Sequence, residues 1–426
     1  MVKSIEWLSL DAIEQKVCDL ASVQLAIRRE RISPSDRILE DLQCDSLDLV
    51  ELLMEIEEEF GVSLPDQAPD PVYKSVWIRR GIRLSDLAEL VYLRQETGAK
   101  ARTVTPTELP PASGVPFTQL GGVWLGGRSE STRLWEPIDE GGPWRVLRRR
   151  TDGMRCVEIP GAEVELGNDG PDSLADERPA HSARIDPFLI DAEPVSTTAY
   201  CRFLNSVGDP SAAALHDWFV LEPDDDRDAH RLVRRGDSGW QPVPGAERWP
   251  MILVSWYGAN AYSLWANGED WSLYRDEELE PASRLPTEAQ WEYAARGPRR
   301  QTYPWGDALP SAALMRFGRH HRHATYTANT LPMADVNASL GMSPFGLHHM
   351  AGNVWQWCRD WYDDAFYSRP ESTVPDPWNR TPARARSERG GSWVGPAELC
   401  RSSYRRGRPP LARGRCLGFR CVSPVP

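Results

Sequence analysis

The composition of the chain changes abruptly near residue 98, and this break limits the fold more than any other feature of the sequence. Residues 1–98 carry 20 acidic and 11 basic side chains, whereas 13 of the 18 tryptophans lie after residue 150. In a single domain we would not expect the acidic residues and the tryptophans to be concentrated in different parts of the chain. The length of 426 residues also exceeds the usual size of one domain. The sequence therefore predicts two or three domains of different kinds.

The overall charge and hydropathy exclude several classes of protein. The net charge of −13 argues against a general nucleic-acid binder, because phosphate-binding surfaces are basic. The N-terminus lacks a basic segment followed by an apolar run, and no stretch of 18 apolar residues occurs, so we expect a cytoplasmic protein without a membrane span. The eight cysteines are too sparse for a disulfide scaffold and do not follow a zinc-binding spacing.

Residues 1–98 have the apolar spacing of a small all-α helix bundle. Helices are expected over 13–27, from about 45 to 60, and over 84–93. The second helix has an apolar stripe formed by Leu49, Leu53, Ile56 and Phe60. It also has a separate acidic stripe formed by Asp48, Glu51, Glu55 and Glu58.

The rest of the chain divides into a connector and a large domain. Residues 99–150 are predicted to be a Pro- and Gly-rich connector that packs in part on a neighbour, because it carries three tryptophans. Residues 151–426 have few long periodic segments, which predicts an irregular α+β domain. The clearest helix in it begins at Thr287, with Gln290 completing a capping box, and ends at Gly297.

The segment from Asp41 to Leu52 resembles the prosthetic-group site of acyl and peptidyl carrier proteins, through Asp45-Ser46-Leu47 and the acidic helix that follows. The resemblance covers about residues 1–98. It implies that a phosphopantetheinyl transferase attaches 4′-phosphopantetheine to Ser46, and that an acyl- or aminoacyl-loading enzyme charges the arm. The chemistry is consistent, since the dipole at a helix N-terminus favours a phosphodiester. The alternative is that Ser46 only caps the helix.

Ten short segments of the large domain, taken in order, resemble the formylglycine-generating enzyme family, also called sulfatase-modifying factors. They are Ile159–Gly161, Glu177–His181, Asp186–Asp191, Val254–Trp256, Arg284–Gly297, Tyr303–Asp307, Phe345–Leu347, Met350–Trp355, Arg389–Trp393 and Gly418–Cys421. Each segment is weak evidence alone, but the ordered set is specific. The resemblance covers nearly all of 157–424 and implies an irregular α+β fold related to C-type lectins.

Members of that family use two cysteines to hold copper and activate oxygen, and soft thiolates suit Cu(I). The resemblance places the later cysteine at Cys400, but the earlier position is Gly395. A single thiolate cannot form a two-coordinate copper site, so the copper pair is incomplete. The best inherited catalytic candidates are Cys400, as a metal ligand or redox thiol, and Ser392, as a hydrogen-bonding group for substrate.

Other members of the superfamily bind iron through a His-x-x-x-His motif in an extra helical domain, and this sequence has no such motif. We expect His320, His321 and His323 to lie in a solvated loop. His348-His349 stand where the family usually has Tyr-Asp, and both are expected to pack or cap. Neither iron nor copper is favoured.

Calcium is a candidate cofactor, because it is common in this fold. Asn353 matches a calcium-ligand position in the segment Gly352–Trp355. Gln356 stands where the family usually has Glu, which removes a charge that Ca²⁺ favours. Asn353 and Gln356 are the predicted ligands.

The stretch from Arg380 to Arg420 contains eleven Arg and only two Glu. It is either a solvated surface with scattered ion pairs or a docking face for the acidic carrier helix, an attraction that salt would screen.

Two functions are therefore open. In the first, the large domain binds or oxidises a group held by the carrier or by a partner. In the second, it is a non-catalytic, lectin-like ligand-binding module attached to a carrier. The incomplete copper pair favours the second and the fused carrier favours the first, so whether the domain is an enzyme stays open.

Overall fold

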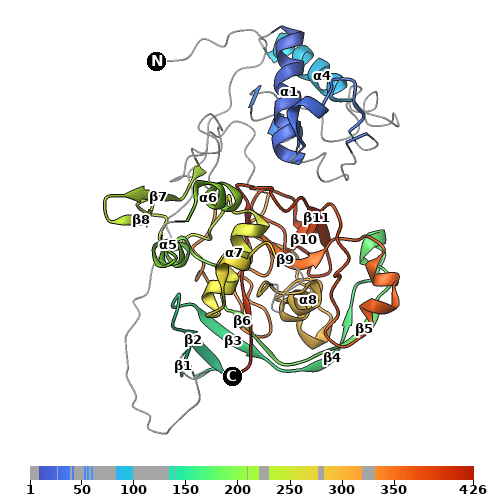
Figure 1. Cartoon of the computed structure of the whole chain (residues 1–426). Helices are drawn as coiled ribbons and strands as arrows, with labels where there is room; N and C mark the ends of the chain where they lie inside the picture. Colours follow the sequence, from blue (N-terminus) through green and yellow to red (C-terminus); the bar gives the residue numbers. More distant parts are fainter. Residues whose placement is uncertain are drawn as a thin grey trace. The chain divides into compact units, whose positions relative to one another are not determined.

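The computed structural model divides the chain into two compact units, Met1–Ser131 and Thr132–Pro426 (Figure 1). It describes residues 9–25, 27–38, 41–42, 52–53, 55–56, 59–60, 83–98, 134–139, 141–208, 210–219, 230–276, 283–318 and 332–426. The α-helices are α1 (Leu10–Leu25), α4 (Leu84–Gly98), α5 (Thr197–Ser206), α6 (Ala212–Trp218), α7 (Trp256–Ala266) and α8 (Glu288–Arg296). No helix in these ranges is both long and apolar enough to cross a membrane.

The N-terminal unit is the predicted helix bundle. The apolar residues Ile13, Val17, Ala21 and Leu25 recur every four positions along α1 and are all buried. They pack with α4 and with Leu53 and Ile56 in one aliphatic core, against which Phe60 also packs. The predicted apolar stripe of the second helix is therefore confirmed for these three residues, while Leu49 lies outside the described ranges.

The C-terminal unit contains two main sheets and two hairpins. The strands are β1 (Trp135–Ile138), β2 (Val146–Arg149), β3 (Arg155–Ile159), β4 (Ala162–Leu166), β5 (His181–Ile185), β6 (Phe188–Asp191), β7 (Val233–Gly236), β8 (Gly239–Pro242), β9 (Trp355–Trp361), β10 (Arg386–Arg389), β11 (Arg405–Arg408), β12 (Leu417–Gly418) and β13 (Val422–Pro424). One sheet has the order β1-β2-β3-β6-β13 and the other β11-β10-β9-β12, while β4–β5 and β7–β8 pair separately. Only the β9–β12 pair among them is parallel.

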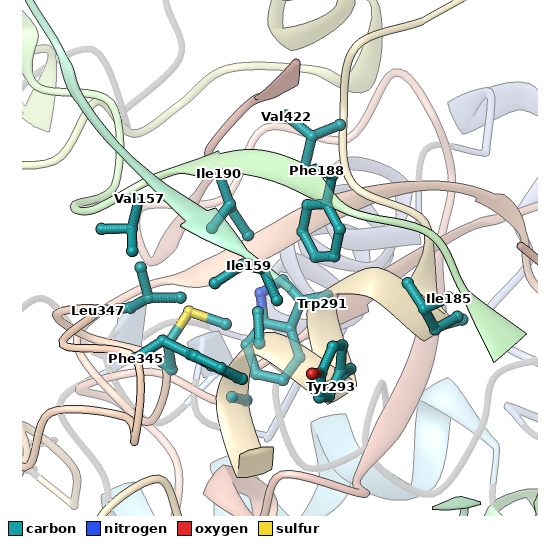
Figure 2. Packing of buried hydrophobic residues seen from close by; sticks show 14 of the residues in the cluster. Val157, Ile159, Ile185, Phe188, Ile190, Trp291, Tyr293, Phe345, Leu347 and Val422 are labelled. Carbon is teal, nitrogen blue, oxygen red and sulfur yellow. The ribbon is translucent and has the colours of Figure 1, made fainter. Parts of the chain in front are cut away.

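The main core of this unit lies between the five-stranded sheet and α8. Val157 and Ile159 alternate along β3 and pair with Ile190 and Phe188 of β6, so one face of both strands is apolar. Figure 2 shows these side chains gathered with Trp291 of α8. The core thereby fixes the helix whose charged residues form the interior network described below.

The predicted boundaries of the helix that begins at Thr287, α8, are confirmed. The Thr287 hydroxyl accepts the N–H of Gln290 at 3.1 Å, and the Gln290 side chain accepts the N–H of Thr287 at 3.1 Å. The helix ends at Gly297, whose φ of 62° lies in the left-handed region that favours glycine. Ser255 caps α7 and Ser196 caps α5 through the side-chain hydroxyl alone, which accepts the N–H of Gly258 and of Ala199 respectively.

The strands β1 and β2 fall within the range 99–150 that was predicted to be a connector, and they pair into the five-stranded sheet. Trp135 is buried in β1, and the indole N–H of Trp144 donates to the carbonyl of Pro344 at 3.1 Å. Trp124 lies outside the residues that the structure describes.

Candidate functional site

The segment that follows β10 brings the predicted catalytic residues together. Gly390 and Gly391 both have positive φ, 97° and 69°, and turn the chain away from the sheet. A Cβ on Gly391 would lie 2.4 Å from the sulfur of Cys400, so only glycine lets the thiol approach the backbone this closely. The turn thus places Cys400 directly against the Gly-Gly-Ser motif.

Cys400 has an apolar environment. Its side chain is fully buried in a cluster with Tyr303, Met315 and Ala351. Burial raises the pKa of the thiol to about 12, although hydrogen bonds from the backbone N–H groups of Gly352 and Ser392 act in the opposite direction. At neutral pH Cys400 is therefore a protonated thiol rather than the thiolate that binds metals or attacks substrates.

The position opposite Cys400 does not fit the family's copper chemistry. A Cβ on Gly395 would lie 2.9 Å from Cδ1 of Leu399, so a cysteine at this position would require the end of the leucine side chain to shift. The Gly395 carbonyl instead accepts the N–H of Gly318 at 2.8 Å. With one buried, protonated thiol and no second sulfur, these residues do not form a two-coordinate copper site.

Ser392 is also inside the fold. It is 1% exposed, and its hydroxyl accepts the N–H of Val394 at 3.3 Å. The structure therefore confines this hydroxyl to its own turn, where it stabilises the segment that carries Cys400. Contact between Ser392 and a substrate would require the segment to move.

The predicted calcium ligands are engaged in protein hydrogen bonds. The side-chain oxygen of Asn353 accepts the N–H of Ala334 at 2.9 Å, and its NH₂ group donates to the carbonyl of Ala334 at 3.2 Å. The oxygen of Gln356 accepts the indole N–H of Trp291 at 3.0 Å and the guanidinium of Arg420 at 2.6 Å. A cation at Gln356 would face this buried positive charge, so the arrangement does not fit Ca²⁺.

The two histidines that follow Phe345–Leu347 are buried. A ring nitrogen of His349 lies 2.9 Å from the carbonyl of Asp335, and burial lowers the pKa of this histidine to about 3. His348 approaches the carbonyl of Ala338 at 3.1 Å. Among the residues described, no three His, Cys, Asp or Glu side chains are placed to hold a metal ion. His320, His321 and His323 lie outside the described ranges.

The prediction that the Arg-rich end forms an exposed basic surface is wrong for most of its arginines. Eight of the eleven are buried, namely Arg386, Arg389, Arg401, Arg405, Arg406, Arg408, Arg415 and Arg420. Arg401 makes a bidentate pair with Glu177, and the guanidinium of Arg386 lies 3.8 Å from the ring centre of Trp256 and 3.6 Å from that of Trp361. These buried guanidinium groups cannot dock an acidic helix, because their charge is directed into the core.

Two glutamates of α8 are the interior residues that sequence reasoning missed. Glu292 accepts hydrogen bonds from the Gly167 N–H at 2.8 Å, from Tyr367 at 2.9 Å and from Arg296 at 2.6 Å, and it also pairs with Arg389. Burial alone would raise its pKa, but Arg389 and Arg296 outweigh this and hold the pKa at about 2.

Glu288 is bound in the same way by Arg405, through two hydrogen bonds of 2.9 and 2.6 Å. The signal that could have found this network is the spacing of Glu288, Glu292 and Arg296, four residues apart along one face of a helix whose other residues are mostly apolar. The Arg-rich end supplies the matching cations.

Ser46, the predicted attachment residue, lies outside the described residues. A family model for the phosphopantetheine attachment site matches residues 15–68, a range that includes this serine. A second family model, the sulfatase-modifying factor enzyme 1-like domain, matches residues 146–425.

Comparison with individual proteins gives relatives of the same kind. The chain is 33% identical to a formylglycine-generating enzyme from Streptomyces coelicolor, over 65% of this chain and 90% of the relative. It is 31% identical to a formylglycine-generating enzyme from Thermomonospora curvata, over 66% of this chain and 96% of the relative. It is also 28% identical to the inactive C-alpha-formylglycine-generating enzyme 2 from Bos taurus, over 63% of this chain and 88% of the relative.

Proposed function

Because the chain belongs to the sulfatase-modifying factor family and also carries a phosphopantetheine attachment-site domain, we propose that it is a carrier protein fused to a ligand-binding domain. The carrier presents an acyl or aminoacyl group, and the large domain binds that group or one held by a partner. A carrier domain implies a phosphopantetheinyl transferase and a loading enzyme as partners.

The carrier half of the proposal assigns 4′-phosphopantetheine to Ser46. The serine hydroxyl forms the phosphodiester, and the helix start that the sequence predicts at this serine would favour the added negative charge. The thiol at the end of the arm then holds the acyl or aminoacyl group as a thioester.

Binding without copper-dependent oxidation rests on one observation, the glycine at position 395 beside a buried and protonated Cys400. The second candidate, oxygen-dependent oxidation by a metal, would have to rely on Cys400 and Ser392 alone. Both side chains are buried and belong to one turn. We therefore assign them a structural role in the large domain.

The carrier half is tested by intact mass after co-expression with a phosphopantetheinyl transferase. The wild-type chain is expected to gain one phosphopantetheine, and Ser46→Ala is expected to gain none. Ser35→Ala removes an exposed hydroxyl of the same unit and is expected to be modified like the wild type. An unmodified wild-type chain, or a modified Ser46→Ala chain, would refute the assignment.

The assignment of the large domain as a binding domain without copper-dependent oxidation is tested against its alternative by metal analysis and oxygen uptake of the purified protein after incubation with copper, before and after Cys400→Ser. We expect no stoichiometric copper and no uptake that depends on Cys400. Copper at one equivalent, with uptake abolished by Cys400→Ser, would show that the large domain is an oxidase.

A further inference from the structure

A groove of about 370 Å³ lies in the segment between β9 and β10, apart from the Gly390–Cys400 turn. This volume is within the range of small-molecule sites, roughly 300–1,000 Å³. Its apolar wall includes Phe366, Val374 and Trp378, and its charged side chains include Glu371, Asp376 and Arg380. The groove thus offers an apolar surface together with charges of both signs.

Contacts with β9 and with the exposed Arg380 fix the Trp378 wall of the groove. The guanidinium of Arg359 lies 4.0 Å from the ring centre of Trp378, and that of Arg380 lies 4.6 Å from it. The neighbouring Asn379 donates from its backbone to Asp360 at 3.0 Å and from its side chain to the carbonyl of Trp361 at 2.8 Å. Because these contacts tie the wall to β9, little ordering remains to be done when a ligand binds.

The groove contains both acidic and basic side chains. Glu371 is exposed, and Asp376 is half-buried with one carboxylate oxygen accepting the N–H of Asp186 at 2.9 Å. The backbone of Asp376 has a φ of 49°, in the left-handed region, which is uncommon for a residue other than glycine. Two arginines line the groove: Arg369 pairs with Asp363 at 2.5 Å, and Arg380 is exposed and supplies the positive charge.

We propose that this groove binds a free α-amino acid with a large apolar side chain. The carboxylate of the ligand pairs with Arg380, its ammonium group pairs with Glu371 and Asp376, and its side chain lies against Val374 and Trp378. A simple acid or a simple amine would satisfy only one of the two charges. The site goes beyond the carrier function and does not depend on Ser46.

The test is calorimetric titration of the full chain with L-phenylalanine, 3-phenylpropanoate and 2-phenylethylamine, which share one aromatic side chain and differ in charge. L-Phenylalanine is expected to bind about tenfold more tightly than either analogue, because each analogue lacks one charge-assisted contact. Glu371→Gln and Arg380→Gln are each expected to weaken L-phenylalanine by about tenfold.

The matched controls are Glu163→Gln and Arg148→Gln, which remove exposed charges outside the groove and are expected to leave binding unchanged. Ser46→Ala is expected to bind like the wild type, so failure of the carrier assignment would leave this result intact. Absence of saturable binding would overturn the site. So would equal affinity for all three compounds, or equal effects of the groove and control variants.

Discussion

Helix α8 and the Gly390–Cys400 turn are neighbours, since a Cβ on Gly390 would lie 2.9 Å from the Trp291 ring, yet their interiors differ in kind. The two glutamates of α8 are surrounded by guanidinium groups and hydrogen-bond donors. The thiol of the turn lies among apolar side chains, and position 395 of the same turn is a glycine. The ion network can therefore hold the fold whether or not the turn supports metal chemistry.

The two regions should respond very differently to substitution. Removing one member of a buried ion pair leaves an uncompensated charge, which is costly even where the intact pair adds little stability. A buried free cysteine behaves as a small apolar residue, so its loss is far less costly.

The largest effect is expected for Glu292→Gln. The neutral amide leaves Arg389 and Arg296 without their carboxylate, which should lower the free energy of unfolding of the 132–426 unit by about 3–5 kcal/mol. Denaturant unfolding followed by tryptophan fluorescence measures this, because 13 of the 18 tryptophans lie after residue 150. Glu163→Gln, on the exposed side of β4, is the control and should change stability by less than about 0.5 kcal/mol. A similar value for both variants would mean that the network is not needed.

The second effect is a loss of stability in acid. The pKa of Glu292 is lowered from 4.5 to about 2 in the folded state, so the folded state holds its proton less tightly than the unfolded chain. The stabilisation is thus complete above pH 4.5 and is lost as the pH falls toward 2. The stability difference between wild type and Glu292→Gln should shrink over this window in denaturant titrations. A difference independent of pH would contradict the role of the ionised carboxylate.

Local features of both regions were predictable from the sequence, and the partners of buried charges were not. The capping box of Thr287 and Gln290 and the stop at Gly297 involve residues close in sequence, so local pattern determines them. The missing sulfur at Gly395 was also visible without a structure.

The burial of the Arg-rich end depends on distant partners. Arg401 meets Glu177 from 224 residues away, and Arg405 meets Glu288 from 117 residues away. An excess of arginine in one stretch is typical of a basic surface, and only the tertiary fold brings the acidic partners to it. The sequence also could not show the partner of Gln356, whose side-chain oxygen accepts a hydrogen bond from Arg420.

The third effect is a gain of copper binding when a cysteine is introduced at position 395. Gly395→Cys places a Cβ against Leu399, and such overpacking should cost about 1–3 kcal/mol. Adding Leu399→Ala should relieve that strain and allow the two sulfurs to bind Cu(I) as a pair. Competition with a chromophoric Cu(I) chelator should then show one tightly bound copper in the double variant and none in the wild type. Equal copper affinity in both would show that position 395 does not limit metal binding.

The smallest effect is expected at Cys400 itself. Comparing the stability costs of two substitutions at this position tests the difference between the two regions directly. Cys400→Ala removes a sulfur from an apolar cluster and should cost about 1 kcal/mol. Cys400→Ser keeps the two backbone N–H donors of Gly352 and Ser392 but buries a more polar group beside Tyr303 and Met315, so it should cost more, about 1–3 kcal/mol. Denaturant midpoints of the two variants give the order. If serine were tolerated better than alanine, the turn would have a polar interior and Cys400 would be a candidate for chemistry. The order expected here makes the thiol a packing residue, as the apolar contacts of Tyr303 and Met315 require.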